Sequence, residues 1–179
     1  MMLPMTTRTR LTLDDFLALP EDKPYLELID GEVCQKPVGK KKHSRAARRI
    51  ARLLEDHPAT RAGEVLPELG MHWWGTARSD HRVPDVSYYA GGRRVTEPYP
   101  DEPPDLVIEV RSEGQSTESI EARLTFLRDQ GVPRTLHIDP ESESVSVWER
   151  GRSWTVQRDE EVRLESLGGF SFAVSDLFD

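Results

Sequence analysis

The sequence predicts a mixed α/β domain in which a β-sheet is flanked by helices and carries additional hairpins towards both ends of the chain. Two observations lead to this prediction. Short runs rich in apolar and β-branched residues alternate with two longer segments of helical periodicity. The chain has 179 residues, of which 36% are hydrophobic, and no low-complexity block divides it. We therefore expect residues 1–179 to form one domain with a sizeable core.

The first predicted elements are a short helix over residues 12–19 and a hairpin over residues 25–35. The hairpin is predicted because Asp30-Gly31 supplies the positive φ values that a tight turn requires. Glu27 lies in its first strand between two leucines. An acidic residue on a strand faces solvent more often than the core, so solvent exposure is the simpler interpretation of this residue.

A basic segment follows the hairpin. From Lys36 through Arg52 the chain has eight basic residues and no acidic one, although its net charge is -8. Residues 43–56 place basic and apolar residues on opposite faces of a predicted amphipathic helix. Such a face on an acidic protein can bind a phosphate backbone, and an ordinary solvated helix face explains it equally well. The expected nucleic-acid contacts are Lys40, Lys41, Lys42, His43, Arg45, Arg48, Arg49 and Arg52.

The candidate site lies between residues 83 and 112. Asp85 and Glu109 each lie within an apolar, strand-like run, on either side of a Gly/Pro-rich connection. Residues 106–110 predict a strand buried on both faces, where an ionised carboxylate is costly unless a positive group neutralises it. Mg²⁺ prefers oxygen ligands and usually takes one or two carboxylates from the protein. The pattern therefore indicates a Mg²⁺ site, in which Mn²⁺ can substitute, suited to phosphodiester hydrolysis.

Two arginines are candidates to accompany these acids. Arg111 lies two residues after Glu109, and side-chain alternation places both on one face of the strand. Residues 118–130 predict a helix, and Arg123 lies on or beside its apolar stripe. A cation at such a position needs a carboxylate partner, and Glu109 or Asp85 is the natural candidate. The alternative is an arginine that extends to solvent at the helix edge.

The remaining segments predict scaffold. Residues 64–74 have strand character and end in Trp73-Trp74, a pair that more often belongs to a core or an interface than to a base-stacking platform. No catalytic cluster is apparent after residue 130. The segments there predict a strand over residues 135–138, a hairpin over 144–156 and two short strands over 162–164 and 170–174.

Several classes of protein and site are disfavoured. The single cysteine, Cys34, excludes an internal disulfide and fits a reducing compartment. No apolar run is long enough for a signal peptide or a membrane span, so we expect a cytoplasmic protein. The five histidines lack metal-ligand spacing on one element, and the chain has neither a Gly-rich phosphate loop nor a nucleophile elbow.

The succession of Pro84-Asp85, a variable gap and Glu109-Val110-Arg111 resembles the PD-(D/E)XK nuclease signature, with arginine where that superfamily usually has lysine. Across nearly the whole chain the sequence resembles the Uma family of restriction-endonuclease-like proteins within that superfamily. The landmarks are RLTLDDFLALPED, YLELIDGEV, His43 opening a helix, VPDVSYY, PPDLVIEVRS and a helix that leads into GVPRTLHIDP.

The resemblance implies a restriction-endonuclease-like mixed sheet with the site at its centre. It implies that Asp85 and Glu109, with the Val110 carbonyl, hold the metal ion, and that Glu27 supports them or binds a second ion. Arg111 or Arg123 would orient the attacking water or clamp the phosphate. The expected partner is DNA, and by analogy with enzymes that cut both strands we expect a homodimer or a higher homo-oligomer.

Two alternatives to a nuclease stay open from the sequence. Arg111 and Arg123 occupy both positions at which relatives carry lysine, and arginine stays protonated, so that it supplies only charge and hydrogen bonds. The chain is therefore also consistent with a catalytically impaired nuclease-fold module that binds DNA or supports assembly. The third interpretation is a purely structural domain in which Glu109 and Arg123 form a buried ion pair.

Overall fold

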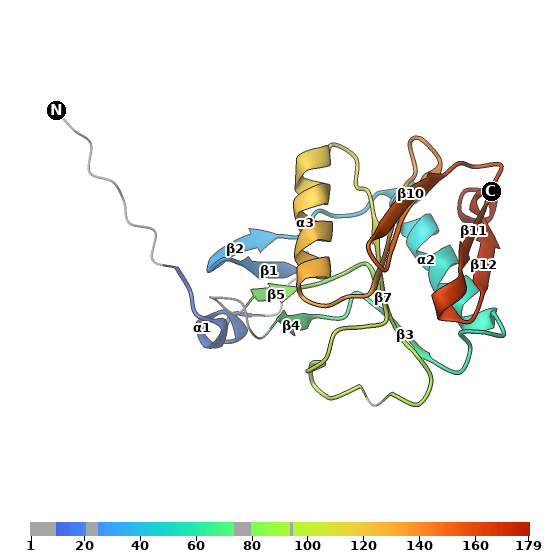
Figure 1. Cartoon of the computed structure of the whole chain (residues 1–179). Coiled ribbons are helices and arrows are strands. Elements are labelled where there is room, and N and C mark those ends of the chain that lie inside the picture. Colours follow the sequence, from blue (N-terminus) through green and yellow to red (C-terminus); the bar gives the residue numbers. More distant parts are fainter. Residues whose placement is uncertain (1–9, 21–24, 74–79, 94) are drawn as a thin grey trace.

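The computed structural model describes residues 10–20, 25–73, 80–93 and 95–179, and in these ranges it contains three sheets and two long helices (Figure 1). The helical segments are α1 (Leu13–Leu17), α2 (Lys41–Asp56), α3 (Thr117–Asp129) and the short 3₁₀ turns η1 (Glu165–Leu167) and η2 (Val174–Leu177). The strands are β1 (Leu26–Ile29), β2 (Glu32–Gln35), β3 (Glu64–Pro67), β4 (Met71–Trp73), β5 (Asp80–Arg82), β6 (Val86–Tyr89), β7 (Leu106–Val110), β8 (Arg134–Asp139), β9 (Ser144–Glu149), β10 (Arg152–Val156), β11 (Glu161–Leu164) and β12 (Phe170–Ala173).

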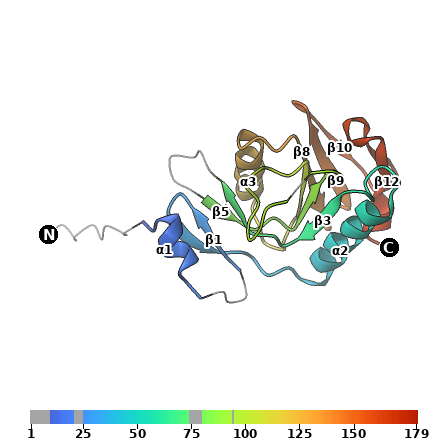
Figure 2. The same ribbon diagram turned by 90° about the horizontal axis from the view of Figure 1, so that it is seen from below.

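A six-stranded mixed sheet, in the order β10-β9-β8-β7-β6-β3, is the centre of the molecule. Strands β7 and β8 run parallel, and the other neighbouring strands run antiparallel. All five residues of β7 are buried, as expected for a central strand covered on both faces. Helices α2 and α3 lie on opposite sides of this sheet in the views of Figures 1 and 2.

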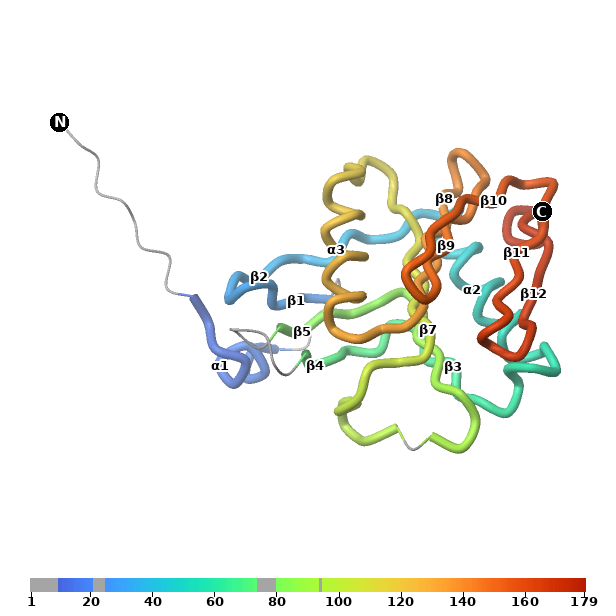
Figure 3. The backbone as a smooth tube through the Cα atoms, in the orientation of Figure 1, coloured from blue at the N-terminus to red at the C-terminus, as the bar shows by residue number. Residues whose placement is uncertain are grey.

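The alternation of side chains along β7 divides the core into two layers. Ile108 and Val110 pack with the apolar face of α2 and with the β11-β12 hairpin. Val107 packs with the apolar stripe of α3 on the other face. The tube in Figure 3 shows β11 and β12 beside α2. Because Glu109 has the same parity as Val107, it faces α3.

A four-stranded sheet in the order β2-β1-β5-β4 forms the N-terminal part of the structure. The β1-β2 hairpin has the register that its turn predicted, with Ile29 opposite Glu32 and positive φ values of 49° at Asp30 and 78° at Gly31. Helix α1 packs on this sheet, and Thr12 begins it with a reciprocal capping box. The chain passes from β5 of this sheet to β6 of the central sheet through residues 83–85.

Most predicted elements are confirmed, with one difference. The predicted strand over residues 64–74 is divided into β3 and β4, because Glu68 adopts a positive φ of 52° that no regular strand tolerates. Trp73 is buried and packs edge-on against Phe126 with ring centroids 5.7 Å apart, whereas Trp74 lies outside the described residues. Within the described ranges, every helix is too short or too polar to cross a bilayer.

Candidate functional site

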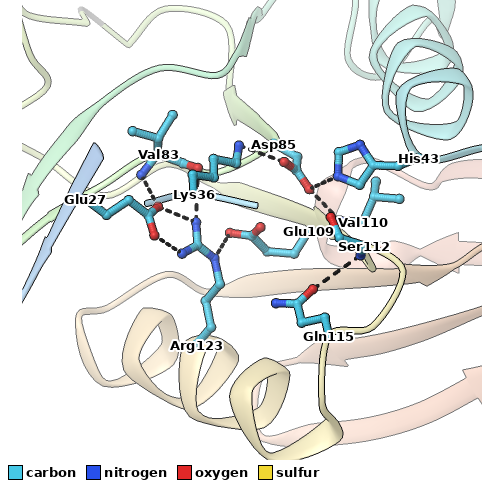
Figure 4. A network of polar contacts seen from close by, with 10 residues as sticks. All are labelled: Glu27, Lys36, His43, Val83, Asp85, Glu109, Val110, Ser112, Gln115 and Arg123. Atoms are coloured by element: carbon cyan, nitrogen blue, oxygen red, sulfur yellow. Dashed lines mark hydrogen bonds and ion pairs between the residues drawn. The ribbon is translucent and has the colours of Figure 1, made fainter. Parts of the chain in front are cut away.

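The candidate site lies where the four-stranded and six-stranded sheets meet (Figure 4). Val86 pairs with Ile108 in the antiparallel ladder, so that Asp85 comes opposite Glu109 one step beyond the last pair. Pro84 has no N–H to continue the ladder. Instead the Asp85 carboxylate accepts the Val110 N–H at 2.7 Å. Asp85 therefore lies immediately before β6 and not within a strand, and it faces Glu109 of the neighbouring strand β7.

Two basic side chains contact Asp85, which is only 4% exposed. The Lys36 Nζ lies 2.7 Å from Oδ1, and the His43 Nε2 lies 3.1 Å from Oδ2. Burial by itself would raise the pKa of the Asp85 carboxyl, but the hydrogen bond to His43 and the charge of Lys36 outweigh it and hold this pKa well below its usual range. Asp85 is thus ionised at neutral pH.

The Lys36 ammonium is a buried cation with unused hydrogen-bonding capacity. Its side chain is 9% exposed, and its contact with Asp85 is an ion pair that lacks the direction of a good hydrogen bond. No other described residue accepts a well-aligned hydrogen bond from Nζ. Since an ammonium carries three N–H donors, Lys36 can donate to a further oxygen at this place.

Arg123 links Glu109 to Glu27. Its Nε donates to Glu109 Oε1 at 2.6 Å, and its two terminal nitrogens donate to the two oxygens of Glu27 at 2.8 and 2.9 Å. Glu27 also accepts the Val83 N–H at 2.7 Å. Burial opposes ionisation of Glu27, but the charge and hydrogen bonds of Arg123, the Val83 N–H and the charge of Lys36 together outweigh it and lower the pKa of this carboxyl. The bidentate pairing confirms that Arg123 is a buried partner of carboxylates.

Glu109 is the least compensated acid of the network. Arg123 binds one of its oxygens, and no described residue donates to the other (Figure 4). Burial raises the pKa of Glu109 to about 7, the Arg123 charge offsets this only in part, and the negative charge of Asp85 adds to the rise.

The charge balance of the network fits a divalent cation and a phosphate. Three carboxylates, from Glu27, Asp85 and Glu109, face the two permanent cations Lys36 and Arg123. One negative charge is therefore uncompensated when all three carboxylates are ionised. A Mg²⁺ ion and one phosphodiester together add one positive charge, which would leave the site neutral.

The donor atoms also fit such an ion. Carboxylate and carbonyl oxygens are the ligands that Mg²⁺ prefers, and it usually keeps several waters. The N–H and C=O of one strand residue point towards the same neighbour, so the Val110 carbonyl faces the side on which its N–H meets Asp85. Clusters of three or more His, Cys, Asp or Glu side chains that could hold a metal do not occur in the described ranges. A Mg²⁺ site here would therefore combine Asp85, Glu109 and Val110 with water and substrate oxygens.

Arg111 has partners other than the two acids. Its Nη1 lies 2.9 Å from Asp139 Oδ2, and its Nη2 donates to the Gln115 carbonyl at 3.1 Å. Alternation along the chain places it on the same face as Glu109, but it lies one residue beyond the end of β7. None of its described contacts joins it to Asp85 or Glu109. The cation that accompanies Asp85 is instead Lys36.

His43 differs from the other predicted nucleic-acid contacts of α2. Its side chain is 13% exposed and points to Asp85, so it belongs to the candidate active site and not to the outer basic face. Arg49 is half-buried and donates to the Asp176 carbonyl. The remaining predicted contacts are exposed and are Lys40, Lys41, Lys42, Arg45, Arg48 and Arg52.

Two sequence interpretations need correction. Glu27 does not face solvent, because it is 3% exposed and paired with Arg123. The sequence interpretation placed Lys36 only in the basic segment, whereas it is the cation that contacts Asp85. A signal for Lys36 was present, because the two-residue turn at Asp30-Gly31 pairs Glu27 with Cys34 and brings the Lys36 N–H to the Tyr25 carbonyl. Alternation then places Lys36 on the same face as Glu27.

Comparisons with known proteins agree with this fold. A family model for Uma2, described as "Putative restriction endonuclease", matches residues 13–175. Among solved structures, the crystal structure of a "putative nuclease belonging to DUF820" from Anabaena variabilis ATCC 29413 matches with a TM-score of 0.79 and 26% sequence identity, over 94% of this chain and 97% of that chain. A comparison with curated protein sequences gave no match. The predicted restriction-endonuclease-like fold class is thereby confirmed.

Proposed function

The chain belongs to the Uma2 family, and from this premise we propose that it is a Mg²⁺-dependent endonuclease that hydrolyses DNA phosphodiester bonds. One observation carries the proposal. Asp85 and Glu109 come together from neighbouring strands beside a buried ammonium, Lys36, that has donors to spare. Each of these charged groups is costly to bury. A bound metal ion and phosphate would compensate the charges of all three groups and so explain why they are buried.

The metal ion would be held by the carboxylates of Asp85 and Glu109 and by the Val110 carbonyl. When bound, Mg²⁺ or Mn²⁺ lowers the pKa of a coordinated water and stabilises negative charge on the phosphate. His43 fixes the orientation of the Asp85 carboxylate through its hydrogen bond to Oδ2. The Val110 N–H fixes the same oxygen from the strand.

Lys36 supplies the amine that the two arginine positions lack. Its remaining N–H donors would hold the attacking water or an oxygen of the phosphate as charge develops there. Arg123 acts as a positioning residue, since it holds Glu109 from α3 and is itself fixed by Glu27. Glu27 therefore acts through Arg123, and a second metal ion is not needed to explain its burial.

A second candidate function is DNA binding or assembly without cleavage. The observation that favours it is that Lys36 and Arg123 already balance most of the negative charge of the site. The Glu109–Arg123 ion pair is the contact that the purely structural interpretation predicts. It does not explain why a fold would keep the Lys36 ammonium without an aligned acceptor, or Glu109 with a raised pKa, because both oppose stability.

Nicking of supercoiled plasmid DNA tests the proposal. The full-length protein should convert the plasmid to open circles with Mg²⁺ or Mn²⁺ and not with EDTA, and Asp85→Asn should abolish the reaction. Asp159→Asn, which alters an exposed turn, is the matched control and should retain it. Salt-sensitive DNA binding without nicking would support the second candidate. The absence of both DNA binding and nicking would support the structural interpretation.

The proposal extends to assembly. Cutting both strands of a duplex usually requires two such sites, so we propose a homodimer or a higher homo-oligomer of this chain. Light scattering after size-exclusion chromatography, with and without DNA, tests this point. A protein that nicks one strand as a monomer would contradict it.

A further inference from the structure

A cleft of about 800 Å³ opens beside the candidate active site, at the start of α2. Its walls come from three segments, the beginning of α2, the connection from β7 to α3 and the turn after β8. His43 lines this cleft and also the two grooves that reach Asp85. The cleft therefore shares the His43 side chain with the two grooves that reach Asp85, where the scissile phosphate would bind.

Four cations line the cleft in addition to His43. Lys40, Lys41 and Lys42 are exposed along one side. Arg111 is half-buried and is held in place by Asp139 and the Gln115 carbonyl. A group of cations beside a nuclease-like site fits the sugar-phosphate backbone of a nucleic acid, which carries one negative charge on each phosphate.

Two ion pairs reach across the cleft. The Lys40 Nζ lies 2.7 Å from the Glu113 carboxylate, and the Lys42 Nζ lies 3.3 Å from the Glu141 carboxylate. All four side chains are between 63% and 71% exposed, so both pairs are weak and are screened by salt. The hydrogen bond and the charge of Lys40 lower the pKa of Glu113, which is therefore ionised at neutral pH.

We propose that this cleft binds the phosphodiester backbone of nucleic acid next to the scissile bond, and that Glu113 and Glu141 stand in for phosphates while it is empty. Binding exchanges each carboxylate for a phosphate, so that Lys40 and Lys42 always have an anionic partner. The two glutamates thus compete with the substrate and set its affinity. This inference rests on the proposed function and adds to it the acidic residues that oppose binding.

Fluorescence anisotropy with a short labelled DNA duplex tests the proposal. The full-length protein is titrated in EDTA, which prevents cleavage, at about 0.1 M salt. An exposed ion pair changes an equilibrium by a factor of about two to three, so Glu113→Gln combined with Glu141→Gln should tighten binding about fivefold. Lys40→Gln combined with Lys42→Gln should weaken binding by at least as much.

A charge-matched control separates local competition from overall charge. Glu161→Gln combined with Glu165→Gln removes the same number of negative charges from exposed positions on β11 and η1, which do not line the cleft. This variant should bind DNA like the unmodified protein. Equal tightening by both double variants would overturn the proposal, because net charge alone would then explain it.

The remaining outcomes are also decisive. If the unmodified protein binds the duplex and the variant without Glu113 and Glu141 does not bind it more tightly, this inference is overturned and the proposed function stands. If the unmodified protein binds no DNA in EDTA and nicks none with Mg²⁺, both are overturned. Thermal unfolding of each variant should match the unmodified protein, since all the altered side chains are exposed.

Discussion

Replacing Glu109 with glutamine should stabilise the fold at neutral pH and abolish cleavage at the same time. Glutamine keeps the shape and the hydrogen-bonding carbonyl of glutamate and removes its buried charge. Arg123 is not left without a partner, because both of its terminal nitrogens remain bound to Glu27. The substitution therefore isolates the cost of one ionised carboxylate in the interior.

The magnitude follows from the pKa of Glu109, which burial and the charge of Asp85 raise from 4.5 to about 7. A group whose pKa is higher in the folded state contributes stability that is fully present below its unfolded pKa and is lost as pH rises through its folded pKa. The native protein should therefore lose about 3 kcal/mol from this group between about pH 4.5 and pH 7, and Glu109→Gln should not. The variant should match the native protein near pH 4.5 and exceed it by about 3 kcal/mol near pH 8.

Urea unfolding at both pH values, without divalent ions, measures this difference, and Asp159→Asn serves as the control for loss of an acidic residue. Addition of Mg²⁺ near pH 8 should stabilise the native protein and leave Glu109→Gln unchanged, since only the native site binds the ion. A variant that is less stable than the native protein near pH 8 would refute the reasoning. Glu109 would then be a stabilising member of an ion pair, as the structural interpretation holds.

Three further predictions test other buried charged or titratable side chains. Lys36→Met should reduce the initial rate of plasmid nicking roughly 100-fold, because it removes the amine beside Asp85, and an unchanged rate would remove Lys36 from the mechanism. Arg123→Met should lower the free energy of unfolding by about 3–5 kcal/mol, since it leaves two buried glutamates uncompensated, and a loss below about 1 kcal/mol in urea unfolding would contradict the buried pairing. Burial and the charge of His72 lower the pKa of His81 to about 4, so native stability should fall by about 3 kcal/mol as pH falls from about 6.5 to 4. In His81→Phe this acid-dependent loss should be absent from the pH profile of stability, and a profile equal to that of the native protein would show that His81 does not cause it.

The proposed roles explain why the network combines stabilising and destabilising groups. Arg123 and Glu27 compensate each other in a bidentate pair, and such a pair holds its position without a ligand. Glu109 and Lys36 are each compensated only in part. Incomplete compensation at a few buried groups is common where binding of substrate or cofactor completes the set of interactions.

Local patterns in the sequence determined most of the fold and several of the site residues. Asp30-Gly31 specified a two-residue turn and with it the register of the β1-β2 hairpin, because few residues adopt positive φ at low cost. The apolar run of residues 106–110 specified a central strand and marked Glu109 as a charge that needed compensation. The position of Arg123 on or beside the apolar stripe of its helix made it one candidate partner of Glu109 or Asp85, and the structure shows the contact with Glu109.

Only the tertiary structure decided which side chains meet. Lys36 and His43 reach Asp85 because the segment after β2 and the start of α2 converge on the start of β6. The turn at Asp30-Gly31 determines the face on which Lys36 lies, but nothing local in the chain encodes this convergence. Alternation places Arg111 on the same strand face as Glu109, yet Arg111 forms its ion pair with Asp139 of the neighbouring parallel strand. Alternation determines the face on which a side chain lies. Which carboxylate a long, flexible cationic side chain contacts depends on which one is near, and this depends on how the sheets and helices pack.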